Sequence, residues 1–176
     1  MNNLNNRRSF TFHQRCVKLV LLMRNILFTL LTCCAALFAA DEYAARGNTW
    51  AQKLVDDTIA KHKEIVVMAL HVASPTDPNY PIIASNIGRI GKKADEDDMR
   101  VVNTGKPNLE VNATGDRFEV ELALRESKGK LIGAAGIVFN YKAGDNKQAL
   151  RKKAEAIAKE MQAQITTKAK LFETLR

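Results

Sequence analysis

The sequence is short of cysteine, and its few cysteines lie close to one end. Only three cysteines occur in the whole chain, and Cys16, Cys33 and Cys34 all fall before Asp41. If the segment before Asp41 is removed, the rest of the chain has no thiol. This excludes a disulfide framework, a thiolate metal site and a cysteine nucleophile from the remainder of the chain.

Histidine is equally scarce, and familiar catalytic motifs are lacking. Only His62 and His71 lie beyond Ala40, and neither has a second ligand at metal-binding spacing. There is no phosphate loop, no cysteine pair for haem attachment, and no nucleophile in a recognisable turn. We therefore expect that the protein is not an enzyme and has no cofactor and no metal site.

The chain also lacks a broad basic surface, although its formal net charge is +8. The segment before Asp41 holds five basic residues and no acidic ones. All 19 acidic residues therefore lie from Asp41 onwards, together with all but five of the 27 lysines and arginines. Outside the leader the charge is near that of an ordinary soluble surface. We expect no nucleic-acid partner.

The segment from Met1 to Ala40 ends with the layout of a secretory signal peptide. Arg24 follows Met23, an apolar run occupies residues 26–38, and Ala39 and Ala40 precede an acidic pair. The apolar run is too short for a comfortable membrane span. We predict cleavage near Ala40, a mature domain of residues 41–176 without a membrane span, and a periplasmic or secreted location.

We expect the natural start of the signal peptide to be Met23, which makes residues 1–22 a gene-start artefact. Two alternatives to this interpretation of the leader remain open. A twin-arginine signal would use Arg7 and Arg8, although Arg24 interrupts the apolar run that should follow. Lipid attachment at Cys33 or Cys34 is the second alternative.

The centre of the domain is predicted to be a β-hairpin over residues 117–141. Phe118, Val120, Leu122 and Leu124 alternate with polar residues, which is typical of a half-buried strand. The second run, residues 131–139, has bulky residues on both parities and small residues at 133–136, so we expect a strand covered on both faces. Something must approach those small residues closely.

Other periodic segments complete an α+β pattern. We predict helices at residues 50–62, 96–103 and 145–175, and strands at 64–73, 81–90 and 109–114. Because helices and strands do not alternate strictly, the fold class is α+β with a five-stranded antiparallel sheet. The C-terminal helix is apolar along one face for more than the sheet should cover, so we expect part of it to contact another chain or to fray.

The acidic segment at residues 95–98 is predicted to begin a helix. Asp95 is suited to the N-cap position, and Glu96, Asp97 and Asp98 would lie in the first turn, where the helix dipole favours negative charge. The spacing lacks the central glycine and terminal glutamate of an EF-hand loop, so calcium is not expected.

Two motifs in this order resemble the single Cache domain, an extracytoplasmic relative of PAS domains. They are VVNTGKP at residues 101–107 and LRESKGKLIGAAGIVF at residues 124–139, and the order of the elements extends the similarity over most of residues 48–145. The resemblance implies a PAS/Cache-like sensor domain whose sheet and covering loops hold a small ligand, often a carboxylate or an amino acid.

Candidate ligand-binding residues come from the strand edges and from the segment that would arch over such a pocket. They are Asn86, Arg89, Lys92, Lys93, Glu119, Glu121 and Tyr141. An Arg or Lys in this segment would hold a carboxylate. These charges are equally typical of a solvated strand edge.

We therefore hypothesise an exported small-molecule-binding, sensor-like domain without its own output module. The alternative is a periplasmic accessory protein that has no ligand and binds a protein partner, or a second copy of itself, through its C-terminal helix. A ligand that raises the melting temperature would distinguish the first hypothesis from the second.

Overall fold

The computed structural model describes residues 46–176. The predicted signal peptide and all three cysteines lie outside these residues. The elements, in chain order, are α2 (Trp50–Lys61), β1 (Ile65–His71), β2 (Ile82–Ser85), α3 (Glu96–Thr104), β3 (Asn108–Val111), β4 (Arg117–Arg125), β5 (Leu131–Asn140), α4 (Lys147–Gln164) and the 3-10 helix η2 (Lys168–Phe172). Within the described residues, no helix combines the length and apolarity that crossing a membrane requires.

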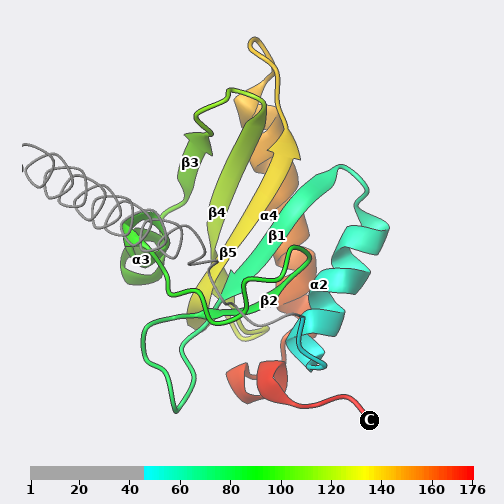
Figure 1. The fold of residues 1–176 in the computed structure, drawn as a ribbon, viewed down its shortest axis with the longest axis vertical. Helices are drawn as coiled ribbons and strands as arrows, with labels where there is room; N and C mark the ends of the chain where they lie inside the picture. The colour runs from blue at the N-terminus through cyan, green and yellow to red at the C-terminus, as the bar shows by residue number, and fades with distance from the viewer. Residues whose placement is uncertain (1–45) are drawn as a thin grey trace, which may run out of the picture. The chain divides into compact units, whose positions relative to one another are not determined.

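The five strands form one antiparallel sheet in the order β2-β1-β5-β4-β3 (Figure 1). This confirms the predicted α+β class, with an N-terminal helix and a C-terminal helix on the domain. Helices α2 and α4 pack on one face of the sheet, and α3 packs on the other. The sheet therefore has a thick apolar side and a thinner side that α3 covers only in part.

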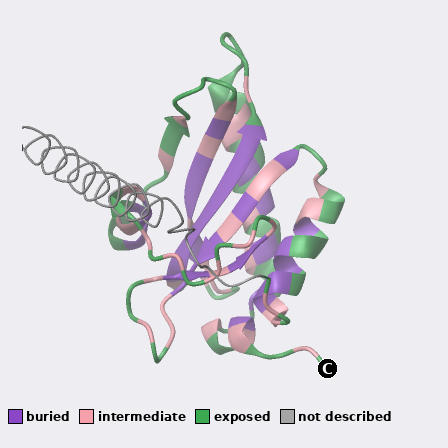
Figure 2. Cartoon of the chain, viewed as in Figure 1, coloured by how far each residue is buried: buried purple, intermediate pink, exposed green. Residues whose placement is uncertain are grey.

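The alternation of β4 decides which side chains reach each face. Phe118, Val120, Leu122 and Leu124 are buried in the main core with α2 and α4. Glu119 and Glu121 consequently point to the α3 side. Strand β5 lies between β1 and β4 and is buried along nearly its whole length, as Figure 2 shows, which confirms a strand covered on both faces.

The small residues of β5 are explained by two different close neighbours. A Cβ atom on Gly133 would lie 2.0 Å from the carbonyl oxygen of His71 in β1. A Cβ atom on Gly136 would lie 2.7 Å from Oε1 of Glu119. The predicted close approach is therefore made by backbone at Gly133 and by a polar side chain at Gly136.

The prediction of one helix over residues 145–175 is wrong at its C-terminal end, because α4 ends at Gln164. Three β-branched residues, at positions 165–167, follow it. The Ile165 carbonyl accepts a hydrogen bond from Ser127 N–H (2.7 Å), and Thr167 caps η2. The turn directs Leu171 into the core, where it is fully buried. The apolar stripe that we expected to contact another chain is thus covered within this one.

The second predicted strand, residues 81–90, is also shorter than expected. β2 stops at Ser85. Beyond it, the Asn86 side chain, in place of a strand backbone, forms the hydrogen bonds to β1. Its Oδ1 accepts from Met68 N–H and its Nδ2 donates to the Val66 carbonyl, both at 2.9 Å. Arg89 has a φ angle of +63°, a conformation that no strand residue adopts. The chain then returns beside β2, and Ile82 N–H donates to the Lys92 carbonyl (2.8 Å).

Candidate functional site

A cavity of about 310 Å³ lies on the α3 side of the sheet, and we call it the α3-side cavity. Its walls come from β1, β2, β4 and β5, from the end of β3, and from the residues at the start of α3. Its lining residues are Val67, Ala69, His71, Ile82, Ile87, Arg89, Lys92, Asp95, Asp98, Glu110, Asn112, Arg117, Glu119, Glu121 and Val138. Apolar strand positions form part of the wall, and charges of both signs surround them.

The segment of residues 86–92 reaches the cavity because both of its ends are fixed. The Asn86 amide holds one end to β1, and the backbone pairing of Lys92 with Ile82 holds the other. The left-handed conformation of Arg89 turns the chain between them. Strain of this kind persists only where surrounding contacts enforce it, and it gathers at ligand sites. Arg89 and Lys92 both line the cavity.

Two glutamates of β4 enter the cavity from the sheet, and both have perturbed pKa values. Burial raises the pKa of Glu121 to about 8, and the negative charges of Asp98 and Glu119 contribute to this rise. Burial also raises the pKa of Glu119, as do the charges of Asp98 and Glu110. Glu121 as a whole residue is 7% exposed, and its Oε2 is the one buried side-chain polar atom in residues 46–176 that has no hydrogen-bond partner.

The start of α3 supplies two aspartates to the same wall. Asp95 Oδ1 accepts hydrogen bonds from the N–H groups of Asp97 and Asp98, and Asp98 Oδ2 accepts one from Asp95 N–H (3.0 Å). This reciprocal capping box confirms the predicted N-cap. Burial raises the pKa of Asp98, although the nearby His71 opposes that shift.

His71 is buried between Asp98 and the loop that follows β1. Its Nδ1 lies 3.0 Å from the carbonyl oxygen of Tyr80, and its Nε2 lies 3.5 Å from Asp98 Oδ2. Since a carbonyl can only accept, Nδ1 carries a proton and Nε2 faces the aspartate.

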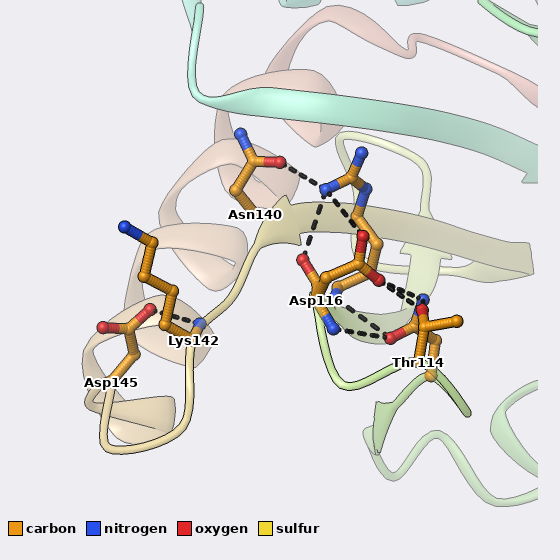
Figure 3. A network of polar contacts seen from close by, with 7 residues as sticks. Thr114, Asp116, Asn140, Lys142 and Asp145 are labelled. Atoms are coloured by element: carbon orange, nitrogen blue, oxygen red, sulfur yellow. Dashed lines mark hydrogen bonds and ion pairs between the residues drawn. The ribbon is translucent and has the colours of Figure 1, made fainter.

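A polar network at the β3–β4 turn fixes the last wall. Asn112 Nδ2 donates to Thr114 Oγ1 and to Asp116 Oδ1, and Arg117 Nη1 donates to Asn140 Oδ1 (2.5 Å) and to the Asp116 carbonyl (3.2 Å). Figure 3 shows Thr114, Asp116 and Asn140 gathered in this network, with Lys142 and Asp145 in the turn beyond β5. The network orders two cavity-lining residues, Asn112 and Arg117.

The structure brings together four of the seven candidate residues from the sequence. Arg89, Lys92, Glu119 and Glu121 line the α3-side cavity, whereas three others do not. Asn86 binds the β1 backbone, and Lys93 is exposed with its charge acting on Asp77. Tyr141 packs on the opposite side, with its ring centroid 5.8 Å from that of Phe118.

Five charged or titratable lining residues were not among the sequence candidates. They are His71, Asp95, Asp98, Glu110 and Arg117. One signal was present for the aspartates: residues three apart lie on the same side of a helix, so Asp95 and Asp98 had to share a surface. Arg117 had the same signal as Glu119, because residues two apart in a strand point to the same face. His71 and Glu110 had no comparable signal, because their positions depend on the neighbouring strands.

Comparisons with known proteins identify the fold and nothing finer. No protein-family model and no curated protein matches the chain. Among solved structures it is similar to the NLH2 GAF domain of A. aeolicus in an inactive state, with a TM-score of 0.51, 12% identity, and coverage of 66% of this chain and 84% of that one. A domain of a putative transcriptional regulator of the IclR family gives a TM-score of 0.41 at 12% identity, covering 71% of this chain and 97% of that one. The first likeness shows a PAS/GAF-like fold and does not single out Cache domains.

Proposed function

We propose that the chain is an exported, sensor-like domain that binds a small organic molecule in the α3-side cavity and does not catalyse a reaction. The observation that carries this proposal is the buried Glu121 carboxyl group, which lines the cavity and has an oxygen without a hydrogen-bond partner. Burying such a group without a partner costs free energy, and perturbed pKa values of this kind gather at binding sites. A cavity of about 310 Å³ is large enough for a small metabolite.

The charges of the wall suit a ligand that carries a carboxylate or is an amino acid. Arg89, Lys92 and Arg117 supply cations, and the guanidinium groups can hold a carboxylate in bidentate fashion. The acidic residues of the wall supply acceptors for an ammonium group. Ile82 and Val138 leave an apolar floor between these groups.

The location and the finer family are proposals on sequence grounds. A periplasmic or secreted location rests on the layout of residues 23–40. Assignment to the single Cache family, within the PAS/GAF-like fold, rests on the motifs at residues 101–107 and 124–139.

The alternative function, partner binding through the C-terminal helix, was suggested by an apolar face that the sheet was not expected to cover. In the structure the domain itself covers this face. Ala154, Ile157 and Met161 of α4 are buried in the main core, as are Ile165 and Leu171 beyond it. We therefore put forward the ligand-binding function alone.

Thermal unfolding of the purified full chain against carboxylates, amino acids, amines and purines tests this function. A ligand of the native state raises the melting temperature by mass action, so one class should raise it by several degrees. Adjacent lysines provide a matched pair of variants, because Lys92 lines the cavity and Lys93 does not. Lys92→Ala should reduce the shift, and Lys93→Ala should leave it unchanged. Absence of a shift with every class, in folded protein, would refute the function.

A further inference from the structure

Three carboxylates from two elements converge at the N-terminus of α3. One carboxylate oxygen from each of Asp95, Asp98 and Glu121 lies within 4.8 Å of the other two. Glu121 comes from β4, and the two aspartates come from the start of α3, so the group is created by the packing of this helix on the sheet. Oxygens that share one divalent cation, each at about 2.0–2.6 Å from it, lie at such separations.

The capping box leaves oxygens available at this place. Asp95 uses Oδ1 and Asp98 uses Oδ2 to satisfy the helix N–H groups. The other oxygen of Asp95 has Lys92 Nζ at 3.8 Å, which is a long contact for an ion pair. The helix terminus is therefore satisfied by Asp95 Oδ1 and Asp98 Oδ2, while Asp95 Oδ2 has only the long contact with Lys92.

Glu121 is a second and independent observation that points to a ligand. It is more than nine-tenths buried, lines the cavity, and has an oxygen with no hydrogen-bond partner. A structural helix cap does not need this residue, since Asp95 and Asp98 already complete the capping box. A buried carboxyl group with one unpartnered oxygen, placed beside two other carboxylates, is unfavourable unless something positive joins them.

His71 adds an orientation that metal-binding histidines commonly have. Its Nδ1–H donates to the Tyr80 carbonyl, so Nε2 is the ring nitrogen that faces Asp98 Oδ2, at 3.5 Å. A backbone carbonyl that fixes the ring through the other nitrogen is the usual support of a metal ligand.

The wall of the cavity holds more carboxyl groups than cationic side chains, which favours a positively charged ligand. Its lining holds five carboxylates, Asp95, Asp98, Glu110, Glu119 and Glu121, and three permanent cations, Arg89, Lys92 and Arg117. Carboxylate oxygens are the ligands of hard ions such as Ca²⁺, Mg²⁺ and Mn²⁺.

We infer that Asp95, Asp98 and Glu121 bind a divalent cation of the Ca²⁺, Mg²⁺ or Mn²⁺ type, with His71 beside it. The inference rests on the proposed function, in that the cation occupies one part of the same cavity. It departs from the sequence expectation of no metal, because the third carboxylate comes from β4 and no linear spacing could reveal it.

Isothermal titration of the purified full chain, freed of metal with EDTA and dialysed, tests the inference with CaCl₂, MgCl₂ and MnCl₂ as separate probes. We expect one ion per chain, with a Kd on the order of 10⁻⁴ to 10⁻³ M or tighter. Glu121→Gln, which removes the charge but keeps the shape, should weaken binding at least about tenfold. Asp95→Asn should weaken it also while retaining a good N-cap residue.

Glu96→Gln is the matched control, since Glu96 is exposed in the same helical turn and does not line the cavity. It should bind the ion as the unmodified chain does. The inference is overturned if none of the three ions binds stoichiometrically to the folded protein. It is also overturned if Glu96→Gln and Glu121→Gln weaken ion binding equally. Binding of a primary amine such as ethanolamine at these residues, without any divalent ion, also overturns it. An organic ligand that binds equally well in EDTA would leave the proposed function standing after the cation site had failed.

Discussion

Gly133 of β5 and His71 of β1 lie so close that a Cβ atom on the glycine would be 2.0 Å from the histidine carbonyl oxygen. The obstacle is backbone in the middle of a sheet, which cannot rotate away as a side chain would. We predict that Gly133→Ala lowers the free energy of unfolding by roughly 1–3 kcal/mol or more, because β1 must move. Urea denaturation measures this.

Gly47→Ala is the control for that variant. A Cβ atom on Gly47 would meet only Thr49 side-chain atoms at ordinary contact distances of 3.7 and 3.9 Å. The stability should change by less than about 0.5 kcal/mol. Equal stability of Gly133→Ala and Gly47→Ala would show that the strands are not packed at the stated separation.

Gly136→Ala should affect binding more than stability. The atom that a Cβ would meet, at 2.7 Å, is Oε1 of Glu119, the end of a flexible side chain. Glu119 can turn aside at a cost of about 1 kcal/mol or less, but it then moves within the cavity that it lines. We expect a near-normal melting temperature and several-fold weaker binding of any ligand found in the thermal screen. A large loss of stability would contradict this.

Stability should depend on pH through Glu121. Burial, with the charges of Asp98 and Glu119, raises its pKa from 4.5 to about 8, so the folded chain holds a proton that the unfolded chain has released above about pH 4.5. The contribution of Glu121 to the free energy of unfolding is therefore fully present below pH 4.5 and is lost as the pH rises through 8. The size of this contribution is on the order of a few kcal/mol at most. Other groups that face Glu121, namely Asp95, Asp98 and Glu119, also contribute to the pH dependence of stability. The charge of Lys92 lowers the pKa of Glu119.

The measurement is urea denaturation in EDTA from pH 5 to pH 8.5, on the unmodified chain and on Glu121→Gln. The glutamine is neutral throughout, so the variant should lose less stability over this range and be the more stable of the two at pH 8.5. Glu96→Gln removes an exposed charge from the same region and should keep the original slope. If the free energy of unfolding changes equally with pH in all three chains, Glu121 is not the cause of the pH dependence.

Leu171 tests whether the segment after α4 belongs to the core. It is 0% exposed, so Leu171→Ala should cost about 2–5 kcal/mol of unfolding free energy. Leu109 is 42% exposed, and Leu109→Ala should cost far less. If both variants are equally stable, the 3-10 helix η2 does not dock on the domain as described.

The order of elements and the central hairpin could be predicted because their signals are local. The alternation around Phe118 and Val120 identified the core face of β4, and therefore placed Glu119 and Glu121 on the other face. The N-cap at Asp95 needed only the residues beside it. The ends of β2 and α4 were missed for different reasons. Gly88, which has a φ angle of +77°, lay within the predicted strand and was a local signal that the strand stops early. After α4 comes a run of β-branched residues, at positions 165–167, without a glycine or proline.

The candidate site was predicted only in part, for a related reason. Tyr141 was assigned to the ligand side, yet it is two residues beyond Phe139, and residues two apart in a strand point to the same face, here the α4 side. His71 and Asp98 could not be joined from the sequence, since their contact depends on how α3 packs across the sheet.

The most direct measurement follows backbone amide NMR signals of the ¹⁵N-labelled chain while the best compound of the thermal screen is added. We predict that the largest shifts fall on residues of the α3-side cavity, such as Arg89, Glu119 and Glu121, and that Lys92→Ala reduces them. Shifts confined to α2 and α4, or none with any compound in folded protein, would contradict small-molecule binding in this cavity.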